Sequence, residues 1–323
     1  MAELADQFVL ARIVNMRGVD LTTFDFDYDL TWQAFFLNSN EHVYGRYGGR
    51  DEGPAEKGLS IAALKYAMRA ALAKHGSDGY AQPERLKKDV RQVEQFAAAR
   101  RVKNDACIHC HQVHDFRREQ LMRAGKWSRD EVWVYPPPEN IGLTLDEKQG
   151  DRIQAVKADS PASGAGLRAG DVIESLGDCP IASYGDVQYT LHHAPKTGKL
   201  TIVWHRDGEK RRGDLMLRDG WRESDISWRG SMWGLEPQAF VYGQDLTVAE
   251  KRELGLSAMR LAFRHGNFVP PESRRAGIRA RDIILGIDGQ KMEMKMLQFN
   301  AHVRLNYKVG DRIVFNVIRN GMR

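Results

Sequence analysis

The fold of this chain is decided by the stretch Ser160-Pro161-Ala162-Ser163-Gly164-Ala165-Gly166-Leu167-Arg168-Ala169-Gly170-Asp171-Val172-Ile173. It predicts a short helix, a turn and a strand in direct succession. The elements expected around it are a glycine loop with its strand, a second strand, a helix and two further strands, at 141–145, 153–156, 184–193, 199–205 and 215–217. Together they predict one small module of strands and helices.

A second copy of this pattern begins at Arg275 and continues to Gly289. A helix at 296–306 and a strand within 313–318 are expected to follow it. The candidate glycine loop of the second copy is Leu254-Gly255-Leu256, which leads into the segment 259–263. An internal repeat of this size predicts two separate modules.

Both copies resemble PDZ domains, and the match of the first copy is specific along its whole length. The resemblance implies that the modules bind peptides by adding a strand to an exposed sheet edge, beside a glycine loop whose N–H groups receive a terminal carboxylate. The matching positions are Ile141, Gly142, Leu143 and Thr144 in the first copy and Leu254, Gly255 and Leu256 in the second. The alternative is that a groove is filled by the protein itself or that a module serves only as a spacer.

A second motif lies upstream of the modules, at Cys107-Ile108-His109-Cys110-His111. This Cys-x-x-Cys-His pattern is the attachment signature of c-type haem. Cys107 and Cys110 would hold the porphyrin through two thioether bonds, and His111 would supply an axial nitrogen. The third cysteine, Cys179, lies in a predicted turn and is expected to be incidental.

Other interpretations of the motif remain open. The distal ligand of a haem would be Met122 or His114, although core packing is the more usual role of a methionine such as Met122. The histidines around the cysteines also fit a zinc site. A redox dithiol or an incidental pair are the remaining alternatives.

The N-terminal part predicts a small α/β arrangement. Strands are expected at 8–14, 32–37 and 42–47, the last two as a hairpin, and a helix at 59–74. This order resembles the second part of a thioredoxin-like fold without its first strand and redox motif. A further helix is expected from Pro83 to Arg101, directly before the Cys-x-x-Cys-His motif.

The chain is therefore predicted to be an α+β multidomain protein. The expected parts are a partial thioredoxin-like α/β domain (1–76), a helical segment with the Cys-x-x-Cys-His motif (77–135) and two PDZ-like β-barrel or sandwich domains (136–220 and 221–323). A length of 323 residues allows each PDZ-like domain its own core.

Composition narrows the function classes. With 42% hydrophobic and 28% charged residues the chain is expected to be globular, and its net charge of +5 is too dispersed to predict nucleic-acid binding. No apolar run approaches the roughly 20 residues that cross a bilayer. A trypsin-like protease is not expected, because no Gly-x-Ser-x-Gly nucleophile context is present.

Localisation follows from the haem hypothesis. Covalent haem attachment occurs outside the cytoplasm and predicts a periplasmic or cell-envelope protein, whereas a protein without haem is expected in the cytoplasm. The sequence begins without a signal-peptide pattern. We therefore expect that the true start lies upstream of Met1.

The whole chain resembles the bacterial thioredoxin-7/PDZ domain-containing (seleno)protein family. The residues that carry this resemblance include 15–20, 27–32, 44–48 and the motif at 107–111, besides the PDZ-like copies. Members of that family can carry a cysteine or selenocysteine redox motif in the thioredoxin part, and no such residue is present here.

Three functions follow as hypotheses. The first is an exported peptide-binding adaptor that carries a c-type haem, redox-linked, with protein or peptide partners in its PDZ grooves. The second is a PDZ scaffold without redox chemistry, whose Cys–His cluster is structural or binds zinc. The third is a thiol or selenol oxidoreductase that exists only in a longer form of the protein.

Overall fold

The computed structural model describes residues 2–53, 59–78 and 90–321 of the chain. These residues form two compact units, Met1–Ser224 and Asp225–Arg323. Each unit contains one four-stranded antiparallel sheet, so the predicted α+β multidomain class with two PDZ-like modules is confirmed. The first unit contains the three parts predicted at 1–76, 77–135 and 136–220, and the boundaries between those parts stay predictions.

The N-terminal part of the first unit is built on a hairpin of β1 (Ala34–Leu37) and β2 (Val43–Tyr47), as predicted. Helix α2 (Ile61–Asp78) packs on this hairpin through a cluster that includes Phe36, Tyr44 and Ala67, and the short α1 (Ala2–Ala5) adds Leu4 and Ala5. The hairpin and its helices do not establish a thioredoxin-like domain, which stays a prediction.

One strand prediction in this part is wrong. Residues 9–16 are irregular, and the side chain of Val9 is fully exposed. β-branched residues favour a strand only where a neighbouring strand and an apolar face receive them. The segment 8–14 has the composition of a strand without that environment.

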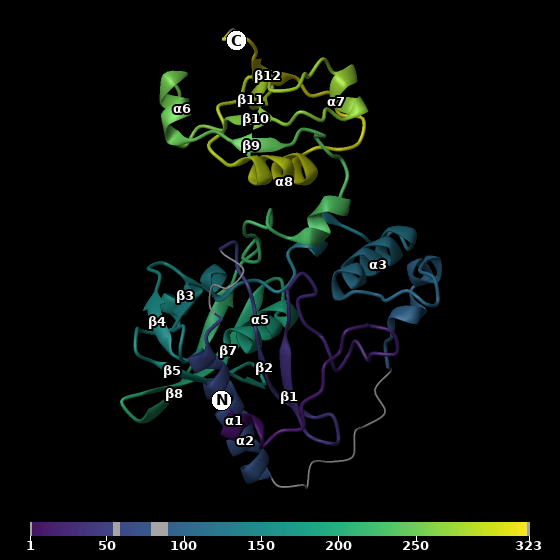
Figure 1. Cartoon of the computed structure of the whole chain (residues 1–323). Coiled ribbons are helices and arrows are strands. Elements are labelled where there is room, and N and C mark those ends of the chain that lie inside the picture. Colours follow the sequence, from purple (N-terminus) through teal and green to yellow (C-terminus); the bar gives the residue numbers. More distant parts are fainter. Residues whose placement is uncertain (1, 54–58, 79–89, 322–323) are drawn as a thin grey trace. The chain divides into compact units, whose positions relative to one another are not determined.

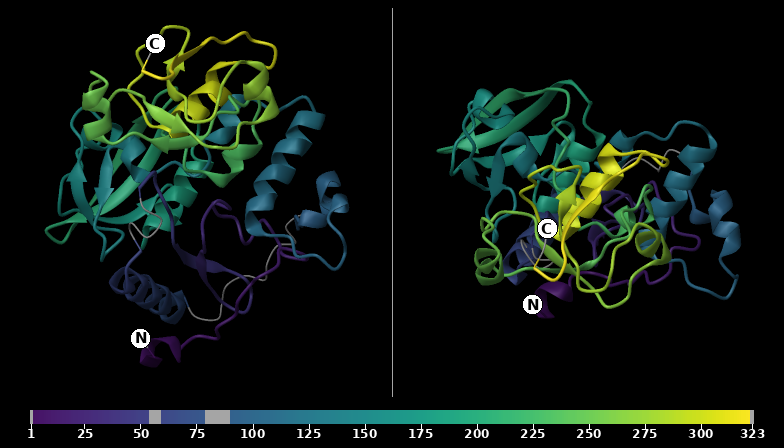
Figure 2. Two further views of the ribbon diagram at one scale, coloured as in Figure 1. Left: turned by 45° about the horizontal axis from the view of Figure 1, so that its top comes forward. Right: turned by 90° about the horizontal axis from the view of Figure 1, so that it is seen from above.

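The Cys-x-x-Cys-His motif lies beside a small apolar core of its own. The elements here are the 3-10 helices η1 (Val93–Gln95) and η2 (Ala97–Arg101), helix α3 (Cys110–Arg123) and the 3-10 helix η3 (Arg129–Val132). Figures 1 and 2 show α3 beside the two 3-10 helices that precede it. The predicted helix from Pro83 to Arg101 is wrong where it can be compared, because Val90–Gln92 is not helical and short 3-10 turns follow. The first part of this predicted helix, residues 83–89, lies outside the described residues.

The first PDZ module follows from residue 138. Its elements, in chain order, are η4 (Pro138–Ile141), β3 (Leu143–Leu145), β4 (Ile153–Val156), α4 (Pro161–Gly164), β5 (Val172–Leu176), β6 (Cys179–Pro180), α5 (Tyr184–His193), β7 (Gly198–Arg206) and β8 (Glu209–Leu217). The stretch 160–173 forms the predicted helix, turn and strand, and Ser160 caps α4 by accepting a hydrogen bond from the N–H of Ser163. One sheet has the order β6-β5-β7-β8, and β3 pairs with β4 in a second sheet.

The second unit repeats this plan. Its elements are η5 (Gly230–Gly234), β9 (Gly243–Asp245), α6 (Val248–Glu253), β10 (Phe263–His265), α7 (Pro271–Arg275), β11 (Ile283–Ile287), α8 (Met296–Asn306) and β12 (Phe315–Ile318). The sheet has the order β12-β11-β10-β9, and its core centres on Phe263, Phe299 and Ile284.

The repeat extends to single hydrogen bonds. Asp171 accepts hydrogen bonds from Arg206 Nε at 2.7 Å and from the N–H of Arg168 at 2.8 Å. In the second unit Asp282 accepts from Arg319 Nε and from the N–H of Arg279, both at 2.8 Å. Both aspartate side chains are buried. An ion pair between a buried aspartate and a partly exposed arginine therefore fixes both the turn before β5 and the turn before β11.

Candidate functional site

The glycine loop of the first PDZ module leads into β3, a strand that pairs on one edge only among the described residues. Gly142 has a φ of +86°, which favours glycine, and a Cβ atom there would lie 2.1 Å from Ser160 Oγ. Ile141 and Leu143 are buried in the module core, and Thr144 is exposed. In the described part of the chain β3 pairs only with β4. An extended peptide can therefore add to its other edge.

Helix α5 presents two side chains toward the segment that precedes β3. The hydroxyl of Tyr184 donates to Glu139 Oε2 at 3.1 Å, and Gln188 Nε2 donates to the carbonyl of Tyr135 at 2.9 Å. The helix begins here because the Ser183 hydroxyl accepts a hydrogen bond from the N–H of Asp186. Tyr184 and Gln188 are four residues apart and thus share one face of α5.

Residues of the N-terminal part cover this same face. The side chain of Gln188 accepts from the N–H of Arg50 at 3.2 Å and donates to the carbonyl of Arg50 at 3.0 Å. A Cβ atom on Gly49 would lie 2.6 Å from both Gln188 Oε1 and Tyr184 Cδ1. The amide of Gln188 therefore holds the segment 48–50 through both backbone groups of Arg50.

Asp186 joins the hairpin to α5 at a buried contact. Its Oδ1 atom accepts from the N–H of Arg46 at 2.8 Å, and its Oδ2 atom accepts from the N–H of Ala182 at 3.2 Å. Burial raises the pKa of Asp186 to about 6, although Arg46 and these hydrogen bonds favour the ionised form. The docked N-terminal part is thus an integral component of the first unit.

In the second unit the predicted loop residues occupy a different position. Leu254, Gly255 and Leu256 end helix α6, where Gly255 has a φ of +67° and the N–H of Leu256 donates to the carbonyl of Lys251. Strand β9, which pairs with β10 as β3 pairs with β4, instead follows Val241 and Tyr242. The predicted loop position of Leu254-Gly255-Leu256 is therefore wrong, because these residues end the inserted helix α6. The segment 241–243, which leads into β9, was not predicted as the loop.

Helix α8 contacts strand β9 of the second unit directly. The N–H of Gly243 donates to Met296 Sδ at 3.0 Å, and the N–H of Met296 donates to Asp245 Oδ1 at 2.9 Å. Asn300, four residues further along α8, donates to the carbonyl of Val241 at 3.2 Å. Met296 and Asn300 therefore take the places on α8 that Tyr184 and Gln188 take on α5.

The residues of the Cys-x-x-Cys-His motif lie in different environments. Cys107 and His111 are exposed, whereas Cys110 is half-buried at the start of α3 and packs against the apolar core there. Burial raises the pKa of the Cys110 thiol. Met122 is 47% exposed, so the core-packing interpretation of this residue is wrong. Cys179 is half-buried, and burial raises the pKa of its thiol as well.

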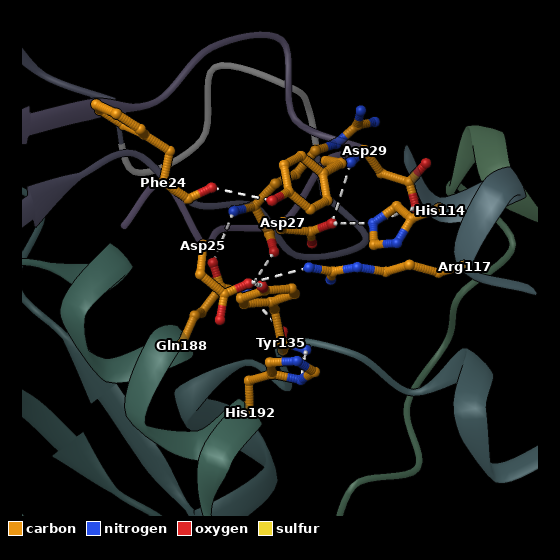
Figure 3. A network of polar contacts seen from close by, with 11 residues as sticks. Phe24, Asp25, Asp27, Asp29, His114, Arg117, Tyr135, Gln188 and His192 are labelled. Carbon is orange, nitrogen blue, oxygen red and sulfur yellow. Dashed lines mark hydrogen bonds and ion pairs between the residues drawn. The ribbon is translucent and has the colours of Figure 1, made fainter. Parts of the chain in front are cut away.

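His114 turns away from the exposed face of α3 into a buried polar network (Figure 3). Its Nε2 atom lies 3.4 Å from Asp27 Oδ1 and 3.9 Å from Asp29 Oδ2. The carboxylates were not predicted as site residues. Their signal in the sequence is an aspartate at every second position, Asp25, Asp27 and Asp29, within an otherwise aromatic segment.

The third aspartate of this series, Asp25, joins α3 to α5, since its Oδ1 atom lies 3.6 Å from Arg117 Nη2 on α3. Asp25 accepts a hydrogen bond from the Tyr135 hydroxyl at 2.7 Å and lies 3.0 Å from His193 Nε2. Burial raises the pKa of Asp25, but the hydrogen bonds from His193 and Tyr135 outweigh it and hold the pKa at about 2. Tyr135 has a φ of +47°, so its backbone is strained beside this network.

Comparison with known proteins agrees with the architecture of the first module. Residues 140–217 match the PDZ domain family. The periplasmic serine endoprotease DegP of Escherichia coli (strain K12) is 31% identical over 163 residues, which are 49% of this chain and 34% of that protein. The serine protease Do-like HtrA of Lactococcus lactis subsp. lactis (strain IL1403) is 34% identical over 65 residues, which are 20% of this chain and 16% of that protein.

The chain thus spans about a third of the length of the DegP relative and less of the HtrA relative. It contains a PDZ domain and is related at distant identity to HtrA and DegP serine proteases. No helix in the described residues is long and apolar enough to span a membrane.

Proposed function

We propose that this chain is an adaptor of the cell envelope that binds extended peptide segments on its first PDZ domain. The observation that carries the proposal is the second edge of β3, which no described strand pairs with, beside the left-handed Gly142 and with α5 alongside. The periplasmic names of the DegP relatives support the location.

The docked segment 48–50 sets a condition for binding. A peptide that uses the amide of Gln188 must replace the two hydrogen bonds that this side chain makes with Arg50. The N–H of Gly142 already donates to the carbonyl of Glu139. Recognition therefore relies on pairing along β3 more than on a terminal carboxylate, and both C-terminal and internal segments are acceptable ligands.

A peptide screen tests this function on the full chain. Fluorescein-labelled ten-residue peptides with free or amidated C-termini would be titrated, and amide hydrogen exchange of the best complex would be measured by mass spectrometry. We expect protection at 141–145 and 184–193. Failure of every peptide to bind wild type and Gln188→Ala, or protection confined to other segments, would refute the proposal.

A haem-carrying form of the adaptor is a second candidate, favoured by the exposure of Cys107 and His111 at the start of α3. Cys107 and Cys110 would attach the porphyrin and His111 would ligate its iron, which would supply electron transfer. Cys110 is half-buried and packs against the apolar core, so attachment at this residue requires its thiol to become accessible. His114 faces Asp27 and Asp29, and Met122 lies about 16 Å along α3 from His111, so neither predicted residue can be the distal ligand of an iron that His111 holds.

An absorbance spectrum and an intact mass test the haem. The chain would be exported in cells that contain the cytochrome c maturation machinery. We expect a Soret band that survives acid-acetone extraction and a mass gain of one haem, both lost in the double variant Cys107→Ala/Cys110→Ala. A colourless protein of unmodified mass would contradict this candidate and leave the peptide-binding function untouched.

A further inference from the structure

Three buried side chains from two distant parts of the sequence converge beside α3 (Figure 3). Asp27 and Asp29 belong to the loop before β1, and His114 belongs to the second turn of α3. Their side chains are 2%, 1% and 9% exposed. One carboxylate oxygen of each aspartate and one ring nitrogen of the histidine all lie within 4.8 Å of one another.

His114 Nε2 makes one long hydrogen bond with Asp27 Oδ1, and the spacing of the three groups also suits a metal coordination shell. A ring nitrogen carries at most one proton, and a separation of 3.9 Å from Asp29 Oδ2 is too long for a hydrogen bond. Ligand atoms about 2.1 Å from a tetrahedral zinc ion lie about 3.4 Å from each other. The distance between His114 Nε2 and Asp27 Oδ1 has this value.

The surroundings hold the three groups in place. Tyr28, between the two aspartates, is fully buried and donates its hydroxyl proton to the carbonyl of Phe24 at 2.9 Å. The ring of Tyr28 meets the ring of His114 edge-on, with centroids 5.4 Å apart. The N–H of Asp29 donates to Asp27 Oδ1 at 3.1 Å. Such supporting contacts orient the ligands of a metal before it binds.

The chemistry of the donors selects the ion. Two carboxylates and one imidazole carry two negative charges when the acids are ionised, and enclosing them at low exposure favours a divalent cation. A mixed set of nitrogen and oxygen donors suits zinc and similar transition metals, whereas calcium and magnesium prefer oxygen alone.

We propose that Asp27, Asp29 and His114 bind a zinc ion that ties the loop before β1 to helix α3. Three protein ligands leave the fourth position of a tetrahedral site to water or to Cys110, which lies one helical turn before His114 on the same face of α3. The site is separate from the exposed Cys107 and His111 and does not depend on peptide binding.

Zinc titration of the full chain tests the site. Protein made without haem maturation would be freed of metal with a chelator, dialysed and titrated with Zn²⁺ by calorimetry, with the bound metal counted by mass spectrometry. We expect one zinc per chain and a rise of the melting temperature on binding. Asp27→Asn and His114→Gln should each weaken binding at least about tenfold.

His111→Gln is the matched control, because His111 lies on the same helix but is exposed, and it should keep wild-type affinity. If His114→Gln fails to fold, the isosteric Asp27→Asn still tests the site. Loss of zinc in Cys110→Ala as well as in Asp27→Asn would support the site with Cys110 as its fourth ligand. Binding below one zinc per chain, or loss only in Cys107→Ala and His111→Gln, would overturn the proposal.

Discussion

The two PDZ-like units share a framework and differ in what contacts the helix beside the edge strand. In both units a buried aspartate pairs with an arginine of the sheet, Asp171 with Arg206 and Asp282 with Arg319. In the first unit the segment 48–50 lies on α5, whereas in the second unit α8 bonds directly to Gly243 and Asp245 of β9. The aspartate and arginine positions repeat because they fix the same turn in each unit. The positions on the faces of α5 and α8 beside the edge strands differ because each helix contacts a different segment.

The largest effect is expected from removing the shared ion pair. Asp171→Ala and Asp282→Ala each remove the buried acceptor of a backbone N–H and of a partly exposed arginine, which should cost about 3 kcal/mol of unfolding free energy. Arg319 is 32% exposed and Arg206 15%, so the loss should be smaller in the second unit. Urea unfolding followed by hydrogen exchange would assign each loss to its unit.

The matched control for this pair is Asp214→Ala. Asp214 forms an exposed pair with Lys199 at 3.5 Å, and its removal should cost less than about 1 kcal/mol. Equal losses for Asp171→Ala and Asp214→Ala would show that the repeated pair is not what stabilises the framework.

A somewhat smaller effect is expected where each edge strand begins. A Cβ atom on Gly243 would lie 1.8 Å from the carbonyl oxygen of Arg264, whereas one on Gly142 would meet the side chain of Ser160. Gly243→Ala should therefore cost roughly 2 kcal/mol in the second unit. The loss caused by Gly142→Ala should be partly restored by Ser160→Gly, measured by thermal unfolding of the double variant.

The double variant distinguishes two reasons why a position requires glycine: a steric clash of the added Cβ atom and a positive φ. A backbone clash at Gly243 cannot be relieved by changing a side chain, but the clash at Gly142 can, apart from the cost of its positive φ. If Ser160→Gly restored nothing, the conformation of Gly142 alone would account for the requirement.

An intermediate effect is expected from Gly49→Ala. The added methyl would overlap Gln188 and Tyr184 at a φ of +126°, so it should weaken the docking of the segment 48–50 by about 2 kcal/mol. Peptide affinity of the first unit, measured by fluorescence anisotropy, should rise severalfold. Gly18→Ala is the control, since Gly18 also has a positive φ but no atom lies near its Cβ position. An unchanged affinity would place the peptide elsewhere.

The smallest effect is a difference in pH dependence between the two helices. Burial lowers the pKa of His192 on α5 to about 3, and the equivalent residue on α8 is Arg304, which stays charged. A depressed histidine pKa gives stability that is complete above about pH 6.5 and is lost as the pH falls toward 3. Between pH 7 and pH 5 the unfolding free energy of wild type should fall by roughly 1–2 kcal/mol more than that of His192→Phe.

The comparison of wild type with His192→Phe reports this group together with its coupling to Asp25 and His193. The raised pKa of Asp186 acts in the opposite sense, since it stabilises the first unit below about pH 4 and this stability is lost as the pH rises through 6. Both proteins contain Asp186, so its contribution cancels in the difference. A difference that does not change between pH 7 and pH 5 would mean that His192 is not held neutral by burial.

Local patterns in the sequence were sufficient for the framework. The stretch 160–173 predicted a helix, a turn and a strand, and its second copy predicted the second unit. Helices α5 and α8 begin and end where the apolar spacing placed them. These features depend on neighbours in the sequence, through caps, glycine turns and the period of buried side chains.

Predictions failed where an element depends on a partner that is distant in the sequence. Residues 8–14 have the composition of a strand, but no sheet receives them, and Val9 is exposed. Leu254-Gly255-Leu256 has the composition of the loop, but the inserted α6 uses it as a helix end. A residue pattern of a few positions cannot distinguish these cases, because the deciding contact is made elsewhere.

The sequence by itself therefore determined the repeated PDZ-like framework and the Cys-x-x-Cys-His motif as a chemical feature. Only the tertiary structure decided that Gln188 holds the segment 48–50 and that His114 faces Asp27 and Asp29 instead of the exposed side of α3. The physical reason is that these contacts join residues far apart in sequence. Their distances and burial are set by the packing of whole elements, which no local pattern records.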